Sequence, residues 1–245
     1  MKLHIQTFEL PLKHTFRISR YERTHQQTFI ISLQDGAHTG YGEATTNPYY
    51  GTTLEQMNTV VEGLRQKIEA YPLDDATTFW EYLHPDLKDD PFVHCAIDQA
   101  AHDLLARKAG LPLYQHWGLT LGDLPLSNYT IGIAPIEEMI KKIKEQPWPV
   151  YKIKLGTDHD LAIIQALRAH TDAYFRIDAN CAWTAQQTID YAPQLQALGV
   201  EFIEQPLPAD RWEDMKRVVA ESVLPVIADE SCRTESDVDR CIGHF

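Results

Sequence analysis

Two patterns of hydrophobic and polar positions divide this chain. Up to about residue 120, the alternation typical of strands gives way to the three- and four-residue spacing typical of helices. From about residue 125, short apolar runs alternate with amphipathic stretches. Such strand–helix repeats predict parallel strands joined by right-handed crossovers. We therefore predict an α+β domain over residues 1–120 and a βα domain over residues 121–245.

The first part predicts three strands followed by two helices. DGAHTG, between the second and third strands, indicates an antiparallel hairpin. In the later helix, apolar residues recur at helical spacing from Val93 to Leu104, and Gly110 is placed to end it. The expected strands cover 2–10, 28–34 and 38–44, and the expected helices cover 53–70 and 89–110.

The second part predicts five strands, and charged residues close four of them at a nearly constant spacing. Lys154, Asp178, Glu204 and Asp229 follow one another at intervals of 24, 26 and 25 residues, about the length of one βα unit. The expected strands are 127–133, 150–156, 173–179, 200–206 and 224–230, and the expected helices are 135–146, 158–170, 184–199 and 210–222.

This spacing favours a closed α/β barrel of the TIM type over an open sheet. In a closed barrel the carboxyl ends of the strands surround one mouth, whereas in an open sheet they lie along a line. Equivalent positions on consecutive strands can therefore converge. The chain has room for five of the eight strands of such a barrel, so its C-terminal part is expected to be incomplete.

The converging residues suit a hard cation. Asp178, Glu204 and Asp229 offer only oxygen ligands, which favour Mg²⁺ and disfavour zinc. Three buried carboxylates without a counter-charge would be very costly. Lys152 and Lys154 of VYKIKLG point to the same face of their strand and can offset charge that a cation leaves.

The paired lysines also indicate a chemistry. A nearby cation or a second lysine lowers the pKa of a lysine, and a lysine with a near-neutral pKa can act as a general base. A base beside a carboxylate-binding metal can remove a proton from the carbon next to a carboxylate, through a metal-stabilised enediolate. We predict that Lys154 is this base.

Each of these residues alone has a simpler interpretation. An acid at a strand end is often a helix N-cap, and a KxK pair often marks a solvated edge strand. The four residues at a constant period favour a shared site.

Composition narrows the function. The chain has 245 residues and a net charge of −13, which disfavours binding to nucleic acid or to an anionic membrane. No apolar run approaches the roughly 18 residues of a membrane span, and the N-terminus lacks the apolar core of a signal peptide. The net charge does not exclude an anionic small-molecule substrate, since a few local cations can dominate a pocket. Four scattered cysteines without a CxxC pair suggest reduced thiols in a cytoplasmic protein.

The motifs YKIKLG, RIDANCAWT, FIEQPLP and IADES, in this order and spacing, resemble the enolase superfamily. The likeness is closest to its muconate-lactonizing-enzyme subgroup and, within that, to dipeptide epimerases. GYGEA and GLPLYQHWG resemble the capping domain and linker of the same family. The resemblance implies a homo-oligomeric, Mg²⁺-dependent isomerase that epimerises a dipeptide such as Ala-Glu. The alternatives are a muconate cycloisomerase or o-succinylbenzoate synthase, and a truncated, non-catalytic paralogue that serves as a binding or structural protein.

The resemblance also implies roles for individual residues. Asp178, Glu204 and Asp229 would hold Mg²⁺. Lys154 would be one acid/base, and Lys152 would lie beside it and touch the substrate carboxylate. The residues expected to orient these groups are Asn180 and Glu230, and Thr130 is expected near the substrate.

In this family the N-terminal domain closes over the barrel mouth, here through loops expected at 17–27 and 45–53. Arg20 and Arg23 in the first loop would hold an acidic side chain, and Tyr50 in the second would wall the pocket. The simpler interpretation is that the arginines solvate a loop and that the tyrosine is a surface residue.

A second catalytic lysine is expected one repeat beyond Asp229, near position 254, whereas the sequence ends at Phe245. We therefore expect these 245 residues to be a truncated product or a segment of a longer chain. Alone, they should lack epimerase activity and fold poorly unless something completes the barrel.

Overall fold

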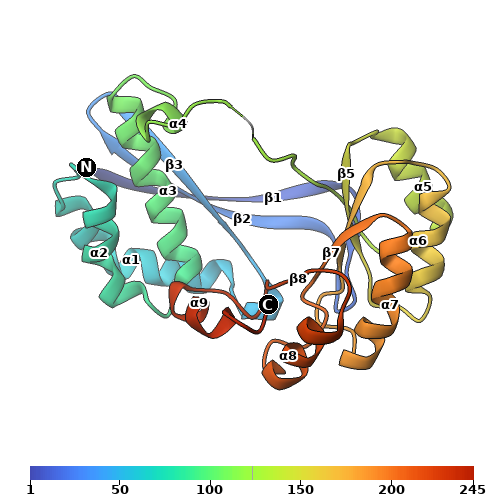
Figure 1. The fold of residues 1–245 in the computed structure, drawn as a ribbon. Coiled ribbons are helices and arrows are strands. Elements are labelled where there is room, and N and C mark those ends of the chain that lie inside the picture. The colour runs from blue at the N-terminus through green and yellow to red at the C-terminus, as the bar shows by residue number, and fades with distance from the viewer. Residues whose placement is uncertain (123) are drawn as a thin grey trace. The chain divides into compact units, whose positions relative to one another are not determined.

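The computed structural model describes residues 1–122 and 124–245. The chain forms two compact units, each with its own hydrophobic core (Figure 1). Unit 1 comprises Met1–Lys13 and His25–Leu124, and unit 2 comprises His14–Thr24 and Pro125–Phe245. A short N-terminal segment therefore belongs to the C-terminal unit.

A three-stranded sheet begins the chain, in the order β1 (Lys2–Arg17), β2 (Glu22–Asp35) and β3 (His38–Thr45). β2 and β3 pair antiparallel from Thr28↔Thr45 to Asp35↔His38, which confirms the predicted hairpin. Gly36, in its turn, has φ of 58°, which glycine adopts without steric cost.

The first two strands run much further than the sequence predicted. The loop expected over 17–27 is confined to residues 18–21, because β1 extends to Arg17 and β2 begins at Glu22. Most side chains of β1 are exposed or half-buried, so this strand lacks the alternation of apolar and polar residues that marks a half-buried strand.

The remaining elements of unit 1 are helical, and one of them was missed. The expected loop over 45–53 contains a 3₁₀ turn, and α2 was not predicted, although Phe79, Leu83 and Leu87 share one buried face. Pro85 lies in its last turn, and an internal proline is typical of a helix break. The elements are η1 (Pro48–Tyr50), α1 (Leu54–Ala70), α2 (Ala76–Leu87), α3 (Pro91–Lys108) and α4 (Leu113–His116).

Two glycines of β3, Gly40 and Gly42, let this strand lie close against α3. A Cβ built at Gly42 would be 1.9 Å from the carbonyl oxygen of Ala96 and 2.9 Å from the nitrogen of Ala100. Because both atoms belong to helix backbone, no side-chain rotation could relieve the clash. GYGEA is therefore a packing motif between a strand and a helix.

Replacing Gly42 by Ala should lower the free energy of unfolding by about 3 kcal/mol or more, as for severe overpacking. Gly63→Ala on α1 is the matched control, because a Cβ added there would have nothing within 4 Å. That change should raise stability by roughly 0.5–1 kcal/mol, since alanine favours helix over glycine. Urea unfolding measures both, and equal effects of the two substitutions would contradict the packing argument.

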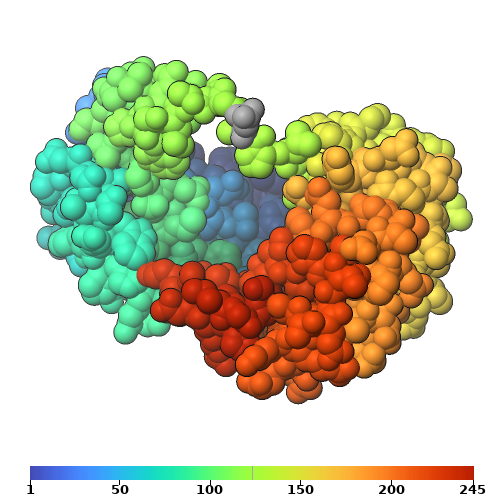
Figure 2. Space-filling model, viewed as in Figure 1, coloured from blue at the N-terminus to red at the C-terminus, as the bar shows by residue number. Residues whose placement is uncertain are grey.

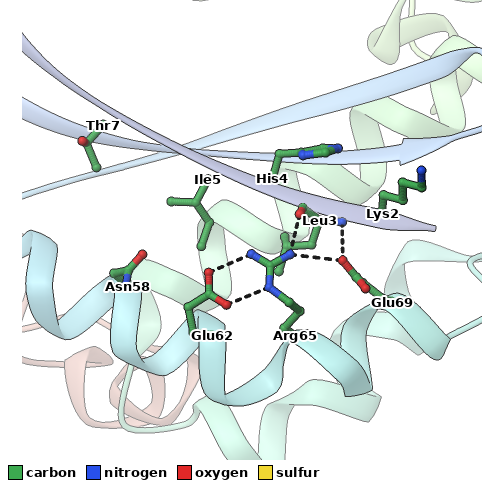
Figure 3. A pocket seen from close by; sticks show the side chains of 9 residues that line it. All are labelled: Lys2, Leu3, His4, Ile5, Thr7, Asn58, Glu62, Arg65 and Glu69. Atoms are coloured by element: carbon green, nitrogen blue, oxygen red, sulfur yellow. Dashed lines mark hydrogen bonds and ion pairs between the residues drawn. The ribbon is translucent and has the colours of Figure 1, made fainter.

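Arg65 on α1 fastens the start of β1. Its guanidinium donates to the carbonyl oxygen of Leu3 at 2.6 Å and pairs with Glu62 and Glu69 (Figure 3). Glu69 in turn accepts from the Leu3 amide at 3.0 Å. These residues line a groove of about 680 Å³. The guanidinium of Arg65 in this groove is already paired with Glu62, Glu69 and the Leu3 carbonyl.

Unit 2 contains five parallel strands in sequential order, as predicted. An open doubly wound sheet reverses its strand order at a switch point, whereas a barrel adds strands one after another. The sheet therefore has the topology of part of a (β/α)₈ barrel. Its strands are β4 (Tyr129–Ile131), β5 (Val150–Lys154), β6 (Tyr174–Asp178), β7 (Val200–Glu204) and β8 (Val226–Ile227).

Four helices connect these strands and pack on the sheet, and a fifth follows the last strand and buries none of its residues. Buried side chains of the strands, such as Ile153, Phe175 and Ile203, share a core with Met139, Ile164 and other helix residues. In the space-filling view the helical segments, coloured yellow-green to red, form a continuous surface on the face shown (Figure 2). The helices are α5 (Ile136–Glu145), α6 (Asp160–Arg168), α7 (Ala185–Ala197), α8 (Trp212–Glu221) and α9 (Glu235–Cys241). Among the described residues of both units, no helix has the length and apolarity to cross a bilayer.

Candidate functional site

The strand register of unit 2 places three of the four periodic residues in one row. Lys154 pairs with Asp178, and Asp178 pairs with Glu204, at the carboxyl ends of β5, β6 and β7. Because the βα repeats are nearly equal in length, residues about 25 apart reach the same level of the sheet.

Asp229 departs from the expected equivalence. The partner of Glu204 on β8 is Ile227, so Asp229 lies two residues further along. The prediction that all four residues occupy equivalent places is therefore wrong for Asp229, because β8 pairs over only two residues and continues as a loop. A shift of two residues leaves a strand side chain on the same face. Carboxylate oxygens of Asp178, Glu204 and Asp229 still lie within 4.8 Å of one another.

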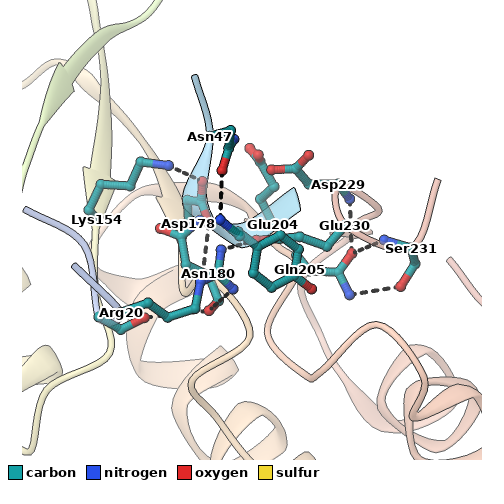
Figure 4. Close-up of polar contacts among 12 residues, drawn as sticks. Arg20, Asn47, Lys154, Asp178, Asn180, Glu204, Gln205, Asp229, Glu230 and Ser231 are labelled. Atoms are coloured by element: carbon teal, nitrogen blue, oxygen red, sulfur yellow. Dashed lines mark hydrogen bonds and ion pairs between the residues drawn. The ribbon is translucent and has the colours of Figure 1, made fainter. Parts of the chain in front are cut away.

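Both lysines of β5 reach this cluster. Lys152 Nζ lies 2.6 Å from Glu204 Oε1 and 3.1 Å from Asp178 Oδ2. Lys154 Nζ donates to Asp178 Oδ2, and the Asn180 amide donates to Asp178 Oδ1 at 2.9 Å (Figure 4). Asp178 is fully buried, so its charge depends on these partners.

Charge and burial shift the ionisation of this network. Burial lowers the pKa of Lys152, but the Asp178 and Glu204 carboxylates outweigh it, so its pKa is raised. Burial raises the pKa of Asp178, but Lys154 and Lys152 outweigh it, so its pKa is lowered. Lys152 and Asp178 therefore hold each other in their charged forms.

The other two carboxylates are less well compensated. Burial, followed by the charge of Asp178, raises the pKa of Glu204 even though Lys152 opposes the shift. The residue Asp229 is exposed overall, yet local desolvation and the charges of Glu230 and Asp178 raise the pKa of its carboxyl. A cation between these oxygens would lower the cost of keeping them ionised.

The donor set fits a hard metal ion. Within the part of the chain that the structure describes, this is the one group of three or more His, Cys, Asp or Glu residues whose ligand atoms converge. All its donors are carboxylate oxygens, which suit hard divalent cations. The cluster can therefore hold a metal through Asp178, Glu204 and Asp229.

Arg20 binds the two residues predicted to orient the site. Its guanidinium donates to Glu230 Oε1 at 2.6 Å and to the backbone oxygen of Asn180 at 2.9 Å. Burial lowers the pKa of Arg20, but the Glu230 carboxylate outweighs it, so its pKa is raised. Asn180 and Glu230 are both buried, and Asn180 has φ of 46°. Arg20 thus fastens the loops that follow β6 and β8 to the segment 14–24.

Arg20→Ala should lower the free energy of unfolding by roughly 2–3 kcal/mol, because it leaves the buried Glu230 carboxylate without its cation. The control is Arg217→Ala, which removes an exposed pair with Glu221 and should cost less than about 1 kcal/mol. Guanidinium unfolding of both variants, followed by far-UV circular dichroism, measures the difference. Equal losses would argue against a structural role for the Arg20 pair.

The other predicted substrate contacts have local partners. Thr130 pairs in register with Lys152 on the neighbouring strand. The Arg23 guanidinium lies over the rings of Phe16 at 5.3 Å and Tyr21 at 5.8 Å. Their contacts with substrate stay predictions.

Tyr50 belongs to η1 of unit 1. Its ring packs against Tyr49 at 4.8 Å and Phe92 at 5.7 Å between centroids. Its place in a substrate pocket stays a prediction.

Two buried polar residues next to the site, Asp160 and Gln205, were not predicted from the sequence. Asp160 accepts from the amides of Gly156 and Thr157 and from the Trp183 indole, and so fixes the loop after Lys154. Gln205 follows Glu204 directly and is fully buried. Its available signal was a polar residue at the end of an apolar strand, immediately before a proline.

Both units match known families. Residues 2–118 match the mandelate racemase / muconate lactonizing enzyme N-terminal domain, and residues 136–244 match the enolase C-terminal domain-like family. These matches correspond to the predicted capping domain and barrel.

Individual relatives cover the whole chain. An L-Ala-D/L-amino acid epimerase of a Maribacter species is 52% identical over 245 residues, which is 100% of this chain and 72% of that protein. The enzyme of the same name from Flavobacterium johnsoniae is 50% identical and covered to 73%. A crystal structure of the dipeptide epimerase from Enterococcus faecalis, complexed with Mg and L-Leu-L-Tyr, superposes with a TM-score of 0.89 at 28% identity, covering 98% of this chain and 70% of that one.

Proposed function

Since the chain belongs to the mandelate racemase/muconate lactonizing enzyme family of the enolase superfamily, we propose that it is a dipeptide epimerase. It inverts the α-carbon of the C-terminal residue of its substrate. The observation that carries this proposal is the meeting of two lysines with three carboxylates at the ends of consecutive strands. The two epimerases at 50% identity or more favour this activity over cycloisomerisation and over a non-catalytic role.

We propose Mg²⁺ as the cofactor, held by Asp178, Glu204 and Asp229. The oxygen-only donor set supports this, as does the related structure with Mg and a dipeptide. When bound, the ion would withdraw negative charge from the substrate carboxylate as the α-carbon loses its proton, which favours the enediolate.

The lysines have different tasks in this proposal. Lys154, buried at the strand end, takes the α-proton from one face of the α-carbon, and inversion requires that a second acid deliver a proton to the opposite face. Lys152 lies between Asp178 and Glu204, so it neutralises the cluster and contacts the substrate carboxylate. Asp178 keeps both ammonium groups in place.

We propose an L-Ala-L-amino acid dipeptide, Ala-Glu among the candidates, with Thr130, Arg20, Arg23 and Tyr50 as contacts. Arg20 would act chiefly through Glu230, because that carboxylate already engages its guanidinium.

We also propose a homo-oligomer in the cytoplasm. The four cysteines are free thiols, which suits a reducing compartment. The net charge of −13 makes nucleic acid and anionic membranes poor partners.

Hydrogen exchange in deuterated water tests the activity. The protein, expressed from its complete coding region with Mg²⁺, should replace the α-proton of the C-terminal residue of L-Ala-L-amino acid dipeptides by deuterium. Proton NMR should show that signal decline as the second diastereomer appears, while the α-proton of the N-terminal alanine persists. No exchange with any member of such a dipeptide set would refute the proposal.

A further inference from the structure

Gln205 occupies an unusual position between the metal-ligand candidates. It follows Glu204 at the end of β7, has no exposed surface and adopts φ of 34°. A non-glycine residue at positive φ is strained and persists only where its surroundings fix it.

The side-chain amide of Gln205 uses both of its ends. Oε1 accepts from the backbone amides of Asp229 at 2.9 Å and Ser231 at 3.1 Å. Nε2 donates to the Leu207 carbonyl at 2.9 Å and to the Ser231 hydroxyl at 2.8 Å. An amide oxygen accepts two hydrogen bonds and an amide NH₂ donates two, so the group is saturated (Figure 4).

The backbone of Gln205 reaches the neighbouring strands on both sides. Its amide donates to the Ile227 carbonyl at 2.9 Å, and its carbonyl accepts from the Cys181 amide at 2.9 Å. Gln205 therefore contacts the loop after β6 and the loop after β8, and it adjoins Glu204 in sequence. These are the three segments that carry Asp178, Glu204 and Asp229.

Asp229 needs this support more than the other two ligands do. Asp178 and Glu204 are the last residues of paired strands, whereas Asp229 lies beyond the two residues of β8. Its backbone amide is held by Gln205 Oε1, and its carbonyl accepts from Cys232 at 2.9 Å in a tight turn. The side chain of Gln205 thus replaces the missing strand pairing.

We propose that Gln205 is a positioning residue that sets the distance between the Glu204 and Asp229 carboxylates and thereby the cation affinity of the site. This inference rests on the proposed function, because it takes the acidic cluster to be a divalent-cation site. Groups that orient metal ligands typically change affinity by about 10- to 100-fold when they are lost.

Three variants test this role with Mn²⁺ alone as the probe, followed through the free-ion electron paramagnetic resonance signal. Gln205→Met keeps the side-chain volume and removes all four side-chain hydrogen bonds, so the dissociation constant should rise roughly 10- to 100-fold. Thr188→Val is the matched control: it removes a fully buried hydroxyl on α7, away from the cluster, and should lower stability without changing the dissociation constant. Equal dissociation constants for wild type and Gln205→Met would overturn the proposal.

Gln205→Glu keeps the test decisive if the methionine variant does not fold. It retains an acceptor for the Asp229 amide and loses the donor to Leu207 and Ser231. Because its added negative charge favours cation binding, its dissociation constant should not exceed the wild-type value, and a rise of about tenfold or more would overturn the proposal. Failure of the wild type to bind Mn²⁺ would instead refute the metal site itself, so the two failures are distinguishable.

Discussion

Replacing Lys154 by Ala is expected to slow α-proton exchange from one diastereomer of the dipeptide by roughly 10²- to 10⁴-fold, the usual contribution of a general base. Lys154 lies at the end of β5, is buried and donates to Asp178. Alanine removes the amine that would take the proton, and the neighbouring Lys152 is a poor substitute because Asp178 and Glu204 raise its pKa.

A second variant separates proton transfer from charge. Lys154→Arg keeps a cation beside Asp178, but arginine stays protonated and cannot serve as a base. Both variants should therefore lose exchange, while the arginine variant should retain more stability. Exchange at the wild-type rate in Lys154→Arg would remove Lys154 from the role of base. Lys216→Ala, on the exposed side of α8, controls for the loss of a lysine elsewhere.

Asp178→Asn should abolish the rise in melting temperature that Mg²⁺ produces, and exchange activity should be lost with it. Asp178 is the most buried of the three carboxylates, and its charge pairs with both lysines. Asparagine keeps the shape but leaves Lys152 with Glu204 alone and takes from Lys154 the carboxylate to which it donates. Breaking a buried pair in this way typically costs about 3–5 kcal/mol of stability.

Differential scanning calorimetry with and without Mg²⁺ measures both effects. Asp172→Asn is a suitable control, because this acid precedes β6 and is distant from its carboxyl end. A wild-type response to Mg²⁺ in Asp178→Asn would contradict the assigned metal ligand.

The barrel topology and the acidic cluster could be predicted because both follow from repeat length. Each βα unit returns the chain to the same edge of the sheet, so residues about 25 apart become neighbours whatever the loops do. This rule holds for three residues that pair directly in the strand register: Lys154 with Asp178, and Asp178 with Glu204. Asp229 is displaced because β8 is short, and sequence pattern does not reveal where strand pairing stops.

The missed features depend on contacts that leave no periodic trace. β1 and the first part of β2, residues 22–27, are mostly exposed or half-buried, so burial does not impose alternation on their sequence. The role of Gln205 depends on its positive φ and on the backbone amides of Asp229 and Ser231, which follow β8. The residues next to Gln205 in the sequence indicate neither feature. The pairing of Arg20 with Glu230 joins residues 210 positions apart.

The assignment of residues 14–24 to unit 2 has an evolutionary consequence. A gene fragment that begins at codon 125 would encode five strands and their helices but would omit the guanidinium that neutralises Glu230. If recombination replaced the N-terminal half by that of another protein, the new half would have to supply an arginine that can pair with Glu230. Mutations at this arginine and at its glutamate partner should be inherited together, so the two halves are expected to diversify as one lineage.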